Sequence, residues 1–175
     1  MNFVNKKNFS IYIFFGSQTG YAESIALYLK KKIITQVKSI TIHIDTLNNF
    51  LNYTITKDEF TIFILSTTGD GEFPDNSNIL YKTLRKNKEI DLGHIHYCLL
   101  GLGDSNYNSF CHASKILDRL LKRKNATKFL DTCFNDESIQ SNETIDKWMM
   151  DVIIYLKDYK ITLWNWFVQS MTSPI

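Results

Sequence analysis

Three short glycine-containing segments constrain the fold of this chain more than any other feature of its sequence. They lie at residues 16–23, 66–75 and 101–107. Each one follows an apolar run typical of a β-strand and leads toward a run typical of a helix. In an open α/β sheet, such loops all lie at the carboxyl edge of the strands, where ligands bind. We therefore expect the three segments to converge on one crevice.

The rest of the chain alternates between strand-like and helix-like runs. Continuous apolar runs at residues 9–15, 60–65 and 95–100 indicate strands buried on both faces, and isoleucines alternate with polar residues over 39–45. A short fifth strand is expected at 128–131. Helices are expected at 22–34, 77–86, 111–124 and 143–159. This order predicts an α/β fold with a doubly wound, five-stranded parallel sheet and helices on both faces.

Composition supports one folded domain. The chain has 175 residues, of which 44% are hydrophobic, and its formal charge of +2 suggests neither a nucleic-acid nor a membrane partner. Three cysteines without metal-type spacing, and no signal peptide, favour a reducing, cytoplasmic location. We assign residues 1–160 to the domain and 161–175 to an aromatic C-terminal tail that includes Trp164, Trp166 and Phe167.

The first segment joins a strand directly to a helix and suits a monophosphate. Ser17 and Thr19 offer hydroxyls, Gly20 permits a tight turn, and the free N–H groups of a helix start favour an anion. No lysine follows Gly20, so the segment is not a triphosphate-binding P-loop, and its glycine spacing does not match the dinucleotide fingerprint. Capping of the helix by Ser17 or Thr19 explains the same residues equally well.

The second and third segments suit a planar ring. Because glycine has no side chain, the backbone amides at Gly69 and Gly71 can approach a polar ring edge. Tyr107 can stack on such a ring. The acids of these segments are also explained as solvated turn residues. The chain has no motif of a serine hydrolase or a zinc protease, so we expect no catalytic side chain and no metal site. A bound cofactor is expected to carry the chemistry.

Together these segments resemble the flavodoxin-like FMN-binding domain of the diflavin reductase family, over roughly residues 11–156. Residues 17–23 (Ser-Gln-Thr-Gly-Tyr-Ala-Glu) look like the family's phosphate loop, and residues 66–75 and 99–107 look like its second and third flavin loops. The methionine synthase reductase branch looks most similar. Reductases of cytosolic iron–sulfur assembly or of cytochrome P450 are the alternatives, as is a flavin-free interaction module with the same fold.

The resemblance implies FMN as the cofactor and electron transfer as the activity. Electrons would come from an FAD/NADPH-binding reductase module, on the same or a separate chain, and would pass to a protein acceptor, with methionine synthase as the candidate. Because the FAD- and NADPH-binding half is absent from this chain, an oxidoreductase component is implied rather than a complete enzyme. The implied FMN-binding residues are Ser17, Gln18, Thr19, Gly20, Ala22, Thr67, Thr68, Gly69, Gly71, Leu102, Gly103, Asp104, Tyr107, Phe110, Cys111 and Asp136.

The sequence departs from the family pattern in two respects. Thr68 stands where many relatives have an aromatic residue, which leaves open what covers the flavin face opposite Tyr107. Domains of this kind are usually acidic, whereas this chain is slightly basic.

Overall fold

A parallel β-sheet forms the centre of the computed structural model, which describes residues 9–172 (for 163, 164 and 166–172, the backbone only). The strand order is β2-β1-β3-β4-β5, and β6 pairs with β4 as well. The strands are β1 (Phe9–Gly16), β2 (Ile40–Thr46), β3 (Phe60–Ser66), β4 (His96–Gly103), β5 (Thr127–Lys128) and β6 (Cys133–Asp136).

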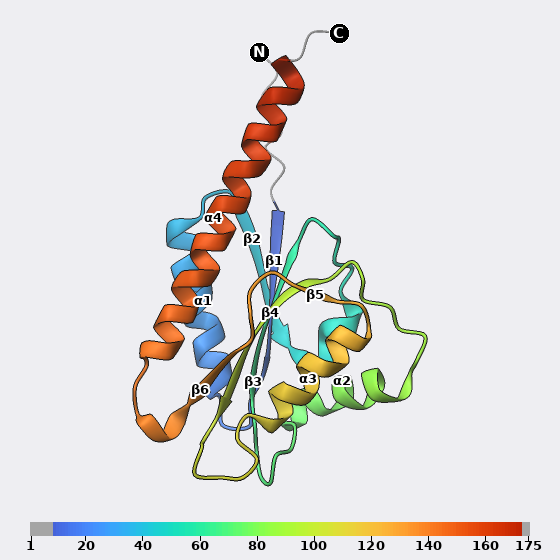
Figure 1. Ribbon diagram of the computed structural model, residues 1–175, viewed down its shortest axis with the longest axis vertical. Coiled ribbons are helices and arrows are strands. Elements are labelled where there is room, and N and C mark those ends of the chain that lie inside the picture. The colour runs from blue at the N-terminus through green and yellow to red at the C-terminus, as the bar shows by residue number, and fades with distance from the viewer. Residues whose placement is uncertain (1–8, 173–175) are drawn as a thin grey trace.

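Helices cover both faces of the sheet, as Figure 1 shows. The buried side chains of α1 (Tyr21–Gln36) and α4 (Glu143–Thr172) belong to one apolar core, and those of α2 (Asp75–Lys86) and α3 (His112–Arg123) belong to the other. Two short 3₁₀ segments, η1 (Leu47–Asn52) and η2 (Glu137–Ile139), complete the described elements. The predicted doubly wound α/β fold is confirmed.

The continuous apolar runs in the sequence arise because the central strands serve both cores. In β1, Ile11 and Ile13 point into the core under α1 and α4, whereas Tyr12 and Phe14 point into the core under α2 and α3. Successive side chains of a strand alternate between faces, so a strand covered on both sides is apolar at nearly every position.

The fifth position of the sheet is divided between two short strands. A single strand was expected at 128–131, but β5 and β6 pair with successive parts of β4. Between them, the Phe129 N–H donates to Tyr97 O of β4 at 2.9 Å, and Thr132 Oγ1 donates to Asp118 Oδ1 of α3 at 3.0 Å, so one backbone bond and one side-chain bond hold this stretch. No apolar pattern indicated β6, because its Asn135 is buried while its Phe134 is 37% exposed.

Helix α4 is longer than expected. A helix was predicted over 143–159, whereas α4 runs from Glu143 to Thr172 and passes through the expected tail without a break. Figure 1 shows that it extends beyond the end of the sheet at which β1 begins, opposite to the end that carries the glycine-containing loops. The side chains of Trp164, Trp166 and Phe167 lie outside the described residues. No described helix has the length and apolar character needed to cross a membrane.

Candidate FMN-binding site

The first loop, between β1 and α1, presents the start of a helix. Gly20 turns the chain in the left-handed region (φ 87°), and α1 begins at the next residue. Ser17 Oγ accepts a hydrogen bond from the Ala22 N–H at 3.2 Å, so the capping alternative holds for this hydroxyl. A hydroxyl accepts and donates at once, so the Ser17 proton is still able to reach a phosphate oxygen. The Thr19 side chain is exposed.

The second loop, between β3 and α2, is a tight turn built around two glycines. Thr68 N–H donates to Glu72 O at 3.0 Å, and Glu72 N–H donates to Thr68 O at 2.7 Å. Gly69 and Gly71, which lie between these two residues, have φ values of 50° and 107°, which L side chains rarely adopt. The turn therefore needs glycine at these positions to hold its shape.

Two hydrogen bonds join the first loop to the segment that begins α2. Ser17 N–H donates to Asn76 Oδ1 at 2.9 Å. Asp75 N–H donates to Gln18 Oε1 at 3.4 Å. Gln18 therefore contacts the second loop in this structure, and Asn76 is a loop-joining residue that the sequence did not reveal.

The second and third loops are also in contact. Ser109 Oγ donates to Asp70 O at 2.9 Å, and Ala113 N–H donates to Thr67 Oγ1 at 3.3 Å. A Cβ atom on Gly71 would lie 2.9 Å from Ser109 Cβ, so the glycine also permits this close approach. Ser109 was not singled out from sequence, because nothing local marks a contact with a residue so far away in the chain.

The third loop, after β4, carries the exposed aromatic ring. Tyr107 N–H donates to Asp104 O at 3.2 Å, and Asn106 N–H donates to Asp104 Oδ1 at 2.8 Å, which makes a compact turn. The Tyr107 side chain is 66% exposed. A Cβ on Gly103 would lie 2.7 Å from the backbone nitrogen of Cys111. A side chain at position 103 would therefore prevent the backbone at Cys111 from approaching this closely.

Asp136 fixes the third loop to the end of β6. Its Oδ1 accepts the N–H groups of Ser105 and Ser138, each at 3.0 Å. Hydrogen bonds from Ser105, and then from Ser138, lower the pKa of Asp136 to about 2, so the carboxylate stays charged at neutral pH. The observed contacts of Asp136 are thus to the loop backbone.

A neighbouring acid, Glu137, was missed in the sequence. Burial raises its pKa, and the charges of Asp104 and Asp136 raise it further. The pKa of Tyr21, at the start of α1, is raised by burial and by the Glu137 charge. Glu137 is therefore close enough to Asp104 of the third loop and to Tyr21 of α1 to affect their charges or be affected by them.

The other expected binding residues differ in how far their side chains are exposed at the surface. The side chains of Ala22, Leu102 and Cys111 are completely buried, so they can offer a ligand only their backbone. Thr67, Thr68 and Phe110 are half-buried. The structure thus brings the three loops together at one edge of the sheet, with Thr19, Gly69 and Tyr107 exposed and Gly71 and Gly103 buried.

These residues fit FMN. The start of α1 offers N–H groups and hydroxyls to a phosphate, and Gly69 of the second loop is exposed at the same edge. The expected free amide of Gly71 is not found, because Gly71 is buried and its N–H donates to Thr68 O at 3.1 Å. Tyr107 adds an exposed ring able to stack on a planar cofactor. The donor set is neutral and suits a monophosphate with an uncharged ring.

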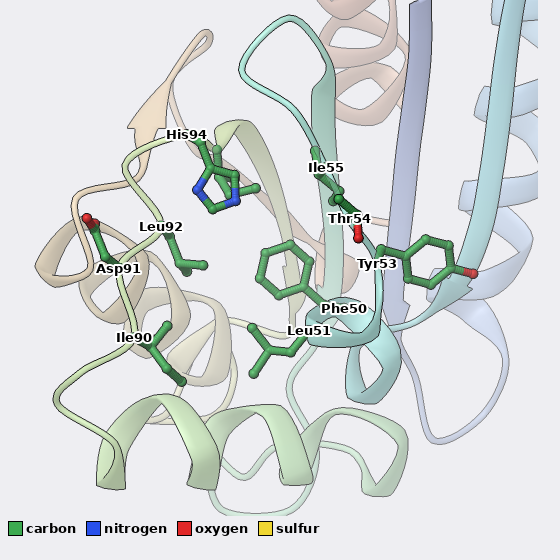
Figure 2. Close-up of a pocket in the computed structure, with 10 residues that line it drawn as sticks. Phe50, Leu51, Tyr53, Thr54, Ile55, Ile90, Asp91, Leu92 and His94 are labelled. Atoms are coloured by element: carbon green, nitrogen blue, oxygen red, sulfur yellow. The ribbon is translucent and has the colours of Figure 1, made fainter.

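A separate hollow of about 370 Å³ lies near the opposite edge of the sheet. Figure 2 shows Phe50 and Leu51 of η1 facing Ile90, Leu92 and His94, which precede β4. None of its lining residues belongs to the three loops, so it is not part of the candidate site.

Comparison with known proteins identifies similar sequences and folds. The family model described as flavodoxin matches residues 13–148. The sulfite reductase [NADPH] flavoprotein alpha-component of Vibrio cholerae is 34% identical over 146 residues, which is 83% of this chain and 23% of that protein. The methionine synthase reductase of Bos taurus is 30% identical over 141 residues, which is 78% of this chain and 20% of that protein.

A solved structure shares the fold. A single-residue mutant of flavodoxin from Pseudomonas aeruginosa superposes with a TM-score of 0.68 and is 23% identical, covering 85% of this chain and 99% of that one. The chain spans about a quarter of the length of the curated relatives it matches, at 23% for the Vibrio cholerae protein.

Proposed function

The chain belongs to the flavodoxin family, whose cofactor is FMN, and we propose that it transfers electrons between a reductase module and a protein acceptor. The observation that supports this most directly is the joining of three loops at one sheet edge, through Asn76 on one side and Ser109 on the other. FMN, when bound, takes up and gives up electrons one or two at a time.

In this proposal the first loop holds the phosphate. Ser17, Thr19 and the N–H groups at the start of α1 donate hydrogen bonds to the phosphate oxygens, and Gly20 sets the turn that aims them. The positive end of the α1 dipole adds to the attraction. In this proposal no cationic side chain is needed to hold the phosphate.

The second and third loops hold the ring. The exposed backbone at Gly69 and Asp70 offers hydrogen bonds to the polar ring edge, and Tyr107 covers one ring face and keeps water from it. Asp136 positions the third loop through its two backbone hydrogen bonds. Thr68 is less bulky than an aromatic residue, so we infer that the second ring face is more open.

The donor that we propose is an FAD/NADPH-binding reductase module, on the same or on a separate chain. Support comes from the relatives, which include a sulfite reductase [NADPH] flavoprotein alpha-component and a methionine synthase reductase, both much longer than this chain. The acceptor that we propose is a protein of the methionine synthase type. A cytoplasmic location is part of the same proposal.

Titration of the purified chain with FMN tests the proposal. We expect a yellow protein, quenching of flavin fluorescence with one FMN per chain, and reduction by NADPH only when a reductase module is added. A chain that folds but leaves FMN fluorescence unchanged would instead be the flavin-free interaction module. A chain that binds FMN but gives no electrons to any acceptor would restrict the function to binding.

A further inference from the structure

The first loop begins at a point where β1, η1 and the first turn of α2 are packed closely together. Gly16, the last residue of β1, has no room for a side chain, because a Cβ there would lie 2.9 Å from Ser77 Cβ and 2.9 Å from Leu47 Cδ1. Ser77 is buried, and its hydroxyl donates to Pro74 O at 2.8 Å. The residues directly before the first loop are therefore held against the start of α2.

Two hydrogen bonds continue this contact into the first loop. The Ser17 N–H donates to Asn76 Oδ1 at 2.9 Å, and the Asp75 N–H donates to Gln18 Oε1 at 3.4 Å. Three successive residues from Gly16 onward thus contact three successive residues of α2 in the opposite order. The N-cap residue of α2 offers no side-chain cap, so the loop supplies an acceptor to α2 while α2 supplies one to the loop.

Asn48 of η1 holds the same turn of α2. Its Nδ2 donates to Asp75 O at 2.9 Å, and its Oδ1 accepts the N–H groups of Ile79 at 2.9 Å and Leu80 at 3.3 Å. In a regular α-helix, the Ile79 N–H and Asp75 O are the two ends of one backbone hydrogen bond. The amide of Asn48 contacts both ends, and it therefore fixes the first turn of α2 relative to η1.

These contacts decide which groups of Ser17 remain for a phosphate. Its N–H is used by Asn76, and its Oγ accepts the Ala22 N–H at 3.2 Å. In the proposed function, the hydroxyl proton of Ser17 and the hydroxyl of Thr19 then donate to the phosphate. A hydrogen bond weakens steeply as its angle closes, so these donors depend on the exact placement of the Ser17 backbone.

We propose that the first turn of α2 positions the first loop for a phosphate, with Asn76 and Asn48 as the positioning residues. Asn76 acts directly on Ser17, and Asn48 acts through α2. The second and third loops are fastened to each other separately, through Ser109 and Thr67. Loss of either asparagine should therefore affect the phosphate more than the ring. The inference rests on the proposed function, since it concerns the phosphate of FMN.

Parallel fluorescence titrations with FMN and riboflavin test the proposal. We expect Asn76→Ala to raise the dissociation constant of FMN roughly fivefold or more, the effect of one lost hydrogen bond, and that of riboflavin less than about twofold. Asn48→Ala should give a difference of the same kind but smaller. The matched controls are Asn78→Ala, a half-buried neighbour on α2, and Asn52→Ala, an exposed residue of η1. Both should bind the two ligands like the wild type.

A double variant tests whether Asn48 acts through Asn76. If it does, Asn48→Ala should change the ratio of FMN to riboflavin affinity less in the Asn76→Ala background than in the wild type. An effect of the same size in both backgrounds would refute the connection through α2.

Amide hydrogen exchange at Ser17 tests the contact without any flavin. The Ser17 N–H should exchange slowly in the ligand-free chain, faster in Asn76→Ala, and slowly again in Asn76→Asp, which keeps an acceptor oxygen. Equal exchange in the wild type and Asn76→Ala, or equal losses of FMN and riboflavin affinity, would overturn the positioning role while the proposed function stands. A wild-type chain that folds but binds neither ligand would refute the proposed function, and the phosphate role with it.

Discussion

At the scale of single residues, the candidate phosphate loop and the exposed Tyr107 ring carry no charge. The loop that starts α1 has hydroxyls, N–H groups and a left-handed glycine, and Tyr107 on the third loop is exposed without being part of the core. Substitutions at these positions should therefore change ligand binding with little change in the fold.

Thr19→Ala should weaken FMN binding more than riboflavin binding. A hydrogen bond to a charged group contributes about 1.5–3 kcal/mol, so the loss for FMN should be roughly tenfold or more, while riboflavin lacks the phosphate. Fluorescence titration with both ligands measures the difference, with Thr35→Ala on the last turn of α1 as the control. Equal losses for the two ligands would remove Thr19 from the phosphate site.

Gly20→Val should weaken FMN binding further. No atom lies within 4 Å of a Cβ placed on Gly20, so the effect comes from its φ of 87° and not from a clash. Asn tolerates this conformation better than a β-branched residue does. Gly20→Asn should consequently bind FMN more tightly than Gly20→Val, and the opposite order would argue against a left-handed turn in the bound state.

Tyr107→Ala should weaken FMN binding and shift the flavin potentials. A stacked aromatic pair contributes about 0.5–1.5 kcal/mol beyond its buried area, and an electron-rich ring disfavours the reduced flavin. The matched control is Tyr28→Ala on α1, a tyrosine that is 50% exposed and lies on a helix instead of a loop. Unchanged affinity together with unchanged fluorescence quenching would place Tyr107 away from the ring.

At the scale of elements, Asp118 of α3 joins the two short strands to the rest of the sheet. Its carboxylate accepts the Tyr97 hydroxyl at 2.8 Å and the Thr132 hydroxyl at 3.0 Å. Lys128 Nζ lies 2.9 Å and Lys122 Nζ 3.0 Å from its oxygens. Burial raises the pKa of Asp118, but hydrogen bonds from Lys128, Lys122, Tyr97 and Thr132 outweigh it, and the pKa is lowered.

Asp118→Asn should lower the free energy of unfolding by about 1–3 kcal/mol at neutral pH, because the amide keeps a hydrogen-bond acceptor but loses the charge that attracts two lysines. A lowered pKa means that this contribution is fully present above the ordinary value of 3.8 and is lost as the pH falls through the lower folded value. Urea denaturation at several pH values measures it. Asp131→Asn, an exposed neighbour, is the control; equal effects of the two variants would contradict the role of Asp118.

Sequence patterns predicted the strands and helices whose apolar residues recur at a regular spacing. They missed the elements that are held in place by individual side-chain hydrogen bonds. The runs of β1, β3 and β4 were evident because each strand is apolar on both faces, whereas β6 places Asn135 inside and Phe134 outside. The length of α4 was underestimated, although no glycine or proline interrupts it before Pro174. At the site, the glycines were evident from their local pattern. Asn76 was not, because its partner Ser17 is 59 residues away in the chain.

At the scale of the whole molecule, acids gather near the candidate site although the net charge is +2. Asp70, Glu72 and Asp75 lie on the second loop or directly after it, and Asp104 lies on the third. A local patch of one sign can steer a partner of the opposite sign even when the net charge is unfavourable. The simpler alternative is that these acids are ordinary turn residues that face water and bind no partner.

If the acids guide a basic partner, electron transfer should slow as salt is added, because charges are screened over about 10 Å at 0.1 M. Charge reversal at Asp70 and Glu72 should slow it as well, with FMN content unchanged. Reversal of Glu89 and Asp131, two exposed acids outside the three loops, is the matched control. Stopped-flow rates that respond to neither salt nor reversal would rule out this docking surface.

The hydrogen bonds from Ser109 to Asp70 and from Ala113 to Thr67 have a thermodynamic consequence. Two loops that are fastened to each other without a ligand lose little conformational entropy when one arrives. Cofactor uptake should then be fast, with a small ordering cost, and amide hydrogen exchange in the second and third loops should be similar before and after loading. We therefore expect contacts within the protein to preorganise the proposed site before the cofactor binds.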